Sequence, residues 1–169
     1  MPHHPAVMRK VVLRDIVTDE DRAAALAVRR GPGQDHFVAS VQQSFDDAVR
    51  DARAVPRYWT INDGDEVVGF VMISDGIPAE RLSDDTDLIG PYFLWRLLID
   101  QGKQRRGYGT AALDAVVEYL RTRPGADVLY TSAGQGEGTP QPFYERYGFV
   151  PTGSVVDDEV VLRLELAGR

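Results

Sequence analysis

The chain has no cysteine among its 169 residues. That absence excludes disulfide bonds, thiolate metal sites and a cysteine nucleophile. No apolar run approaches the roughly 20 residues that cross a bilayer, and the opening stretch Met1–Pro5 lacks the apolar core of a signal peptide. We therefore expect a cytoplasmic protein with no membrane partner and no bound metal.

Basic residues are also in short supply. The 19 Lys and Arg residues face 26 Asp and Glu residues, so the formal net charge is -7. A nucleic-acid partner usually requires a basic face, and none is expected here. The acidic balance is compatible with a cationic acceptor such as an amine. Asp84, Asp85 and Asp87 form an acidic run that is either an attractor for such an amine or a solvated turn.

The length fits one domain, covering residues 1–169, with residues 1–9 as a flexible tail. Strand and helix patterns are interleaved, which predicts a mixed α/β (α+β) fold. A first strand over Val11–Val17 leads to Thr18, a helix N-cap candidate, and the helix should continue through Ala23–Arg30. Ser44-x-x-Asp47 predicts the start of a second short helix.

Turn residues divide the rest of the chain into short elements. Asn62–Asp65 separates two apolar runs and predicts a β-hairpin. The segment Tyr92–Ile99 is apolar and aromatic enough to be a mostly buried strand. The other expected elements are a strand that begins at 127–131, a helix over 140–147, and final strands at 150 and 155–166.

The segment Gln104–Gly109, with the sequence Gln-Arg-Arg-Gly-Tyr-Gly, is a basic glycine turn at the start of an amphipathic helix. The helix is predicted by the i, i+3, i+4, i+7 spacing of the apolar residues Leu113, Val116, Val117 and Leu120. Free N–H groups and the positive end of the helix dipole meet at such a turn, and glycines let an anion approach the backbone. The turn is therefore a candidate phosphate site.

The charges around this turn support the assignment, because no Asp or Glu falls between Asp100 and Asp114. Lys103, Arg105 and Arg106 lie inside that gap. The turn lacks the spacing and the Lys of a Walker phosphate loop, and it lacks the third glycine of a dinucleotide fingerprint. A nucleoside triphosphate and a nicotinamide cofactor are therefore poor candidates.

The turn resembles the Gln/Arg-x-x-Gly-x-Gly/Ala acyl-CoA loop of the GNAT superfamily of N-acetyltransferases, with Gln104, Gly107 and Gly109 in its three fixed places. A second segment, Phe143–Phe149, resembles that superfamily's Phe-Tyr-x-x-x-Gly-Phe motif. More narrowly, the chain is similar to the bacterial polyamine (spermine/spermidine) acetyltransferase-like branch, and the similarity rests on the segments 94–100, 151–153 and 159–161.

The resemblance implies a mixed, mostly antiparallel sheet of about seven strands, splayed at the central strand and flanked by about four helices. It implies transfer of an acetyl group from acetyl-CoA to a primary amine by direct attack in a ternary complex. A polyamine or another small cationic amine is the expected acceptor, and a homodimer through exposed sheet edges is an expected assembly. Two alternatives stay open, a non-catalytic acyl-CoA sensor and an enzyme acting on peptide or protein N-terminal amines.

The resemblance also implies a site. Tyr144 would return a proton to the leaving thiolate, since an unperturbed phenol stays protonated at neutral pH. The central strand carries no acid at Leu94-Trp95-Arg96, and no general base is assigned among Glu80, Asp100 and Glu165. Many relatives bind CoA with an Asn where this chain has Glu137. The cofactor would be bound by Leu97, Leu98 and Ile99 of the strand and by Gln104, Arg105, Arg106, Gly107, Tyr108, Gly109 and Thr110 of the turn.

Overall fold

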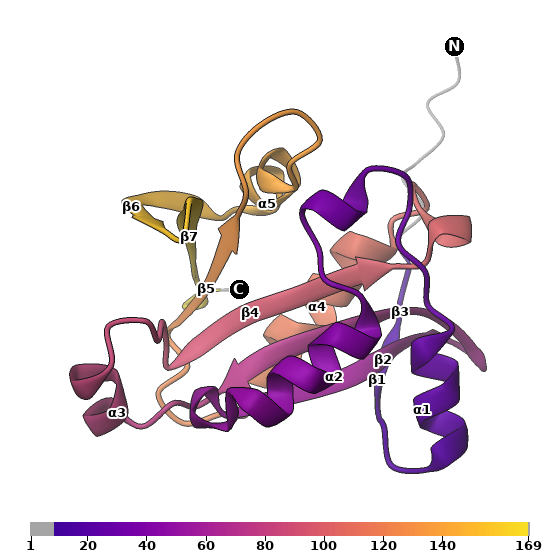
Figure 1. The fold of residues 1–169 in the computed structure, drawn as a ribbon, viewed down its shortest axis with the longest axis horizontal. Helices are drawn as coiled ribbons and strands as arrows, with labels where there is room; N and C mark the ends of the chain where they lie inside the picture. Colours follow the sequence, from indigo (N-terminus) through magenta and orange to yellow (C-terminus); the bar gives the residue numbers. More distant parts are fainter. Residues whose placement is uncertain (1–8, 169) are drawn as a thin grey trace.

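The computed structural model describes residues 9–168. These residues form one seven-stranded sheet in the order β1-β2-β3-β4-β5-β7-β6 (Figure 1). Every pairing is antiparallel except the parallel pairing of β4 with β5. The predicted mixed, mostly antiparallel sheet is confirmed. In chain order the strands are β1 (Val12–Asp15), β2 (Pro56–Asp63), β3 (Glu66–Asp75), β4 (Tyr92–Ile99), β5 (Val128–Ala133), β6 (Val150–Val156) and β7 (Glu159–Glu165).

Five α-helices accompany the sheet in the described part of the chain, one more than expected. α3 is the helix that the sequence pattern did not predict, because its six residues carry no apolar stripe. The helices are α1 (Asp19–Leu26), α2 (Val41–Arg50), α3 (Ala79–Asp84), α4 (Tyr108–Leu120) and α5 (Gln141–Tyr147). α1 and α2 cover one face of the central strands, and α4 covers the other (Figure 1).

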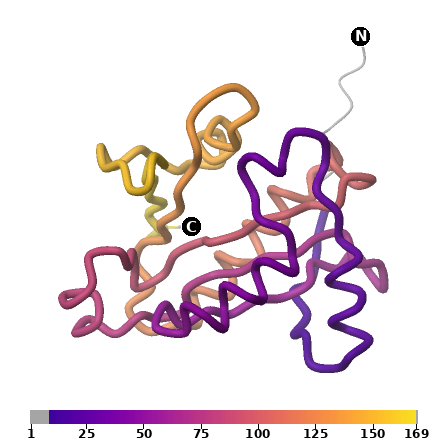
Figure 2. The backbone as a smooth tube through the Cα atoms, viewed as in Figure 1, coloured from indigo at the N-terminus to yellow at the C-terminus, as the bar shows by residue number. Residues whose placement is uncertain are grey.

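The central strands β4 and β5 separate along most of their length. Within residues 9–168 they pair only at Phe93↔Tyr130 and Leu94↔Thr131. Beyond that point β5 turns away from β4, and a gap between the two backbones widens toward the end of β4 (Figure 2). A bulge in β4 lies at the same place, because Met72 pairs with Arg96 and Ile73 pairs with Leu94. The predicted splay at the central strand is therefore present, with a bulge on one side of it.

Two apolar clusters stabilise the two faces. On the α4 face, Leu113 and Leu120 are fully buried and pack with Leu94 of β4. On the other face, Phe45 of α2 packs with Phe70 of β3, and their ring centroids lie 5.7 Å apart. The predicted burial of β4 is only half right, since Trp95 and several neighbours are partly exposed where β5 no longer covers the strand.

Local signals predicted the strand–turn boundaries better than the helix boundaries. Thr18 caps α1, and a capping box with Asp21 completes that N-terminus. The hairpin between β2 and β3 turns at Gly64–Asp65 as expected. The prediction that α1 reaches Arg30 is wrong, because the helix ends at Leu26 with Ala27 as its C-cap.

The predicted start of α2 is also wrong. Ser40 is its N-cap, so Ser44 and Asp47 lie inside the helix, and both are buried. The Ser-x-x-Asp spacing that suggested a cap instead places two polar side chains on the buried face. The first eight residues of the predicted tail lie outside the described part of the chain. Arg9, its last residue, donates from Nε to the carbonyl of Arg106 at 2.7 Å.

Candidate active site

The basic turn ends in a sharp backbone reversal at the start of α4. Gly107 is the N-cap of α4 with φ +84°, a left-handed conformation that favours glycine, and no side chain caps the helix there. The first intrahelical bond runs from the Ala111 N–H to the Gly107 carbonyl. Helix geometry therefore leaves the N–H groups of Tyr108, Gly109 and Thr110 without intrahelical acceptors, as an anion site requires.

The cations of the turn are used unequally. Lys103 is paired through Nζ with Glu66 of β3. Arg105 and Arg106 are exposed, and within residues 9–168 neither forms an ion pair with an acidic side chain. Arg105 also has a left-handed backbone, with φ +63°. The two arginines beside the helix N-terminus are thus the ones available to a phosphate group.

The side chain of Tyr108 lies away from the turn. It is buried, and its hydroxyl donates to the Asp63 carboxylate of the β2–β3 hairpin at 2.6 Å. That hydrogen bond, with burial, raises the pKa of Tyr108 above its ordinary value. Tyr108 was predicted to bind the cofactor, and only its backbone N–H faces the turn.

Gly109 is required by packing inside the protein. A Cβ at this position would lie 3.0 Å from Cζ of Phe143 in α5. The third fixed residue of the turn motif thus contacts the first residue of the Phe143–Phe149 motif, so the two motifs meet where α4 and α5 pack. This contact explains physically why a small residue follows Gly107 by two positions.

Gln104 connects the turn to β4 and to the segment between α1 and α2. Its Nε2 donates to the Ile99 carbonyl at 3.2 Å and to Oε1 of Gln34 at 2.8 Å. The Gln34 oxygen also accepts from the Gly31 N–H at 2.6 Å. The side chain therefore positions the turn, rather than pointing freely into solvent.

The open edge of β4 leads from the splay to this turn. The Asp100 N–H bonds to the Val68 carbonyl of β3, and the direction of backbone groups alternates along a strand. The N–H groups of Leu97 and Ile99 therefore face the gap, while Leu98 pairs with Phe70 and buries its side chain. An extended ligand can pair with this edge as an added strand.

Tyr144 lies in α5 beside the point where β4 and β5 part. Burial raises the pKa of Tyr144 to about 12, a hydrogen bond with Thr131 acts in the opposite direction, and the charge of Glu159 raises it further. Thr131 in turn donates to the Leu94 carbonyl at 3.0 Å, across the last β4–β5 pair. The phenol thus stays protonated through the neutral range.

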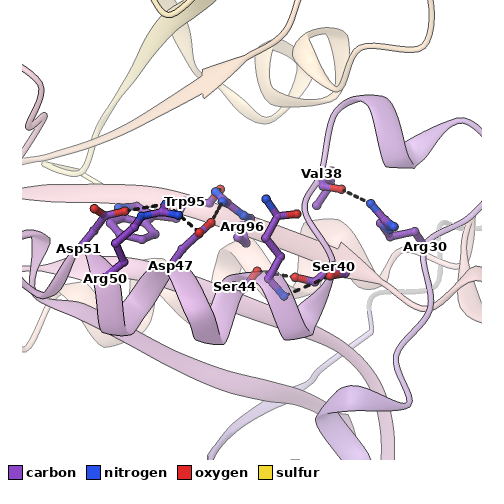
Figure 3. Close-up of polar contacts among 10 residues, drawn as sticks. Arg30, Val38, Ser40, Ser44, Asp47, Arg50, Asp51, Trp95 and Arg96 are labelled. Atoms are coloured by element: carbon purple, nitrogen blue, oxygen red, sulfur yellow. Dashed lines mark hydrogen bonds and ion pairs between the residues drawn. The ribbon is translucent and has the colours of Figure 1, made fainter.

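On the β4 side of the splay there is a partly buried ion pair that sequence reasoning missed. Asp47 projects from α2 toward β4, where its Oδ2 lies 2.7 Å from a guanidinium nitrogen of Arg96 (Figure 3). Its Oδ1 lies 2.8 Å from Arg50, one turn further along α2. The spacing of Ser44 and Asp47 places both side chains on one face of a helix, but it was interpreted as a helix cap.

The other residues considered from sequence lie elsewhere. Asp100 accepts backbone N–H bonds from Arg29 and Gly102. Glu165 is paired with Arg163. Glu80 is exposed on α3, which lies near the paired end of β4 (Figure 1). Glu137 is exposed in the loop between β5 and α5.

The acidic run considered as an amine attractor lies near α3, at the opposite end of β4 from the turn (Figure 1). Asp84 ends α3, and Asp85 and Asp87 follow it outside any helix or strand.

Two kinds of feature are absent from residues 9–168, a metal-binding cluster and a membrane-spanning helix. These residues contain no group of three or more His, Asp or Glu side chains able to hold a metal ion. None of their helices combines the length and apolar character needed to cross a bilayer.

Known proteins share both the sequence pattern and the fold. A family model described as the acetyltransferase (GNAT) family matches residues 22–149. The spermine/spermidine N(1)-acetyltransferase of Bacillus subtilis (strain 168) is 27% identical over 139 residues, covering 82% of this chain and 88% of that protein.

Solved structures show the same architecture at lower identity. An acetyltransferase from Thermus thermophilus has a TM-score of 0.64 at 21% identity, covering 92% of this chain and 97% of that one. The PaiA N-acetyltransferase from Thermoplasma acidophilum, solved in complex with coenzyme A, has a TM-score of 0.60 at 14% identity, covering 92% and 99%. With the family match spanning most of its length, the chain belongs to the acetyltransferase (GNAT) family of N-acetyltransferases.

Proposed function

We propose that this chain transfers the acetyl group of acetyl-CoA to a primary amine by direct attack in a ternary complex, with Tyr144 as the acid that protonates the leaving thiolate. The observation that carries the proposal is the continuous path from the basic turn, along the unpaired edge of β4, to the buried side chain of Tyr144. Each part of that path meets one requirement of acetyl transfer.

The turn supplies the anion site for the CoA pyrophosphate. Arg105 and Arg106 contribute charge, and the N–H groups at Gly107–Thr110 contribute hydrogen bonds. Gln104 acts by holding the turn against β4. The N–H groups of Leu97 and Ile99 bind the pantetheine arm and direct one donor at the thioester carbonyl, where negative charge develops.

Tyr144 acts at the opposite end of the path. The phenol retains its proton at neutral pH, because burial raises its pKa to about 12. A thiolate is a stronger base in a site that excludes water, and the buried position of Tyr144 provides that environment. Proton transfer from the phenol to sulfur prevents the thiolate from attacking the new amide.

Small cationic amines are the first acceptors to test, and spermine and spermidine lead them because a relative of this chain is named for acetylating both. The assay measures release of free CoA thiol from acetyl-CoA with a panel of polyamines, monoamines and peptide N-termini. Turnover with a small amine is the expected result. Binding of acetyl-CoA without turnover on any of them would favour the sensor alternative, and turnover on peptides alone would favour the N-terminal alternative.

Gly107→Glu tests the phosphate site directly. A carboxylate at the helix N-terminus repels the pyrophosphate, so the KM for acetyl-CoA should rise at least about tenfold. Gly125→Glu is the matched control, since Gly125 also has a left-handed backbone, φ +67°, with open space around it. If Gly107→Glu bound acetyl-CoA as wild type does, the assignment of the turn would be wrong.

A homodimer also remains a proposal. β1 and β6 are the edges of the sheet, and Val12 and Val150 are exposed on them. Pairing of these edges between two copies would cover those side chains. Light scattering after size exclusion measures the mass, and a monomer at the concentrations of the assay would exclude this assembly.

A further inference from the structure

Ser132 is the first residue of β5 beyond its last pair with β4, so it borders the opening of the splay. Its hydroxyl donates to Oε1 of Glu159 at 3.4 Å. Glu159 is the first residue of β7 and is partly buried. A carboxylate therefore lies at the β5 side of the opening, although the central strand β4 has none.

The register of the sheet decides which face this carboxylate occupies. Ser132 pairs with Val161 and Ala133 pairs with Val160, so Glu159 lies on the same face as Ser132. Thr131 lies on the other face together with Ala133, which packs in the same apolar cluster as Tyr144. Glu159 and Tyr144 thus approach the opening from opposite faces of the sheet.

Asp47 and Glu159 lie on the two sides of the opening, and they differ in their charge partners. Asp47 reaches the β4 side through Arg96, but both of its oxygens are paired with arginines (Figure 3). Within residues 9–168, no Lys, Arg or His side chain forms an ion pair with Glu159. The charge of Glu159 also contributes to the raised pKa of Tyr144, although burial is the main cause.

Glu159 also faces space that an acceptor can occupy. It lines a pocket of about 600 Å³ with His36 and Phe37 of the α1–α2 connection and with the two carboxylates of the β6–β7 turn, Asp157 and Asp158. The Phe37 ring lies over Gly134, where a Cβ would be 2.9 Å from the ring. The α1–α2 connection is therefore held across the opening and forms the far wall of the pocket.

We propose that Glu159 is the group that binds the ammonium of the acceptor and accepts its proton, directly or through one water. This inference rests on the proposed acetyl transfer and adds the base that the sequence did not supply. Glu159 takes one proton from the ammonium, and the neutral amine nitrogen forms a bond to the thioester carbon. The C–S bond then breaks, and the thiolate takes its proton from Tyr144. The second amine proton returns the tyrosine to its neutral form, and Glu159 releases its own to solvent, so one proton is released per acetyl transferred.

The test compares wild type, Glu159→Gln and Glu159→Asp over pH 6.5 to 9.5 with spermidine and with a monoamine. General-base catalysis contributes about 10²-fold or more, so Glu159→Gln should lose about 100-fold in kcat/KM for the amine at pH 7. The loss should shrink as pH rises, because the free amine fraction grows about tenfold per pH unit below the amine pKa near 10. Glu159→Asp keeps the carboxylate and should retain intermediate activity.

Glu165→Gln is the matched control, because it removes a carboxylate from the other end of β7. The groups around Glu159 that titrate are Asp157 and Asp158 of its turn, His36 across the pocket, and Tyr144. The KM for acetyl-CoA and the melting temperature should stay at wild-type values in Glu159→Gln.

Three outcomes would overturn the inference. Wild-type kcat/KM in Glu159→Gln would reject the base while leaving acetyl transfer intact. A loss that is equal at every pH, or that Glu165→Gln reproduces, would show a structural role. Absence of turnover by wild type on every amine and peptide would reject the proposed function and this role together.

Discussion

Replacing Asp47 with Asn should destabilise the protein strongly, because it removes the charge that compensates Arg96. The Asp47 side chain is 7% exposed and the Arg96 side chain 23% exposed. Nε of Arg96 is already buried without a hydrogen-bond partner among the described residues. Removing one partner of a buried pair costs about 3–5 kcal/mol, and the partial exposure of Arg96 lowers this to about 2–4 kcal/mol.

That cost is large against the roughly 5–15 kcal/mol by which a domain is stable. Urea unfolding followed by circular dichroism measures it, and the midpoint should fall while the slope with denaturant stays constant. Arg50→Gln is the control. Arg50 contacts the same carboxylate, but its side chain is 69% exposed, so its loss should leave the midpoint unchanged.

A double replacement separates the charge from the packing. Asp47→Leu with Arg96→Met removes both charges and keeps apolar volume, so it should recover most of the stability lost in Asp47→Asn. A midpoint for Asp47→Asn within error of wild type would refute the reasoning. The reasoning would also fail if the double variant lost as much free energy of unfolding as its two single replacements lose together, because the two side chains would then be uncoupled.

Three further predictions concern the active site and the core. Tyr144→Phe should lower kcat about 10- to 100-fold while the KM for acetyl-CoA stays the same, and wild-type turnover would exclude Tyr144 as the acid. The pKa of Tyr144 is raised to about 12 in the folded protein, so the phenol ionises at lower pH in the unfolded chain. The contribution of Tyr144 to the free energy of unfolding should therefore be complete below about pH 10 and fall by about 2–3 kcal/mol toward pH 12. Urea unfolding at a series of pH values should show a smaller loss in Tyr144→Phe. Leu113→Ala should cost about 2–5 kcal/mol because the side chain is fully buried, whereas the exposed Glu118→Ala should leave the unfolding midpoint near wild type; equal midpoints would contradict the packing of α4.

Short-range signals predicted most of the fold. The hairpin at Gly64–Asp65, the cap at Thr18 and the amphipathic stripe of α4 depend on residues within one or two turns of each other, so they can be read locally. The helix boundaries at Leu26 and Ser40 could not be predicted in this way, because no glycine or proline directly follows the last residue of α1.

Parts of the site were also local. Gly107 needs a left-handed backbone, and the apolar spacing after it predicts the helix that makes the turn a candidate anion site. The need for glycine at position 109 could not be predicted from neighbouring residues, because it arises from the contact with Phe143 of α5. The base that we propose had no signal in the sequence, because Glu159 reaches the splay from another strand.

The sequence by itself determined the mixed fold, the basic glycine turn at the start of α4 and the resemblance to an acetyltransferase, because these depend on periodicity and on motifs of a few adjacent residues. Only the tertiary structure decided which acidic groups meet at the splay and which of them are neutralised. Asp47 and Glu159 are far apart in the chain, and their roles follow from Arg96 and Ser132, which the sheet register places at the two sides of one opening. Charge compensation acts through space, so a linear pattern does not encode it.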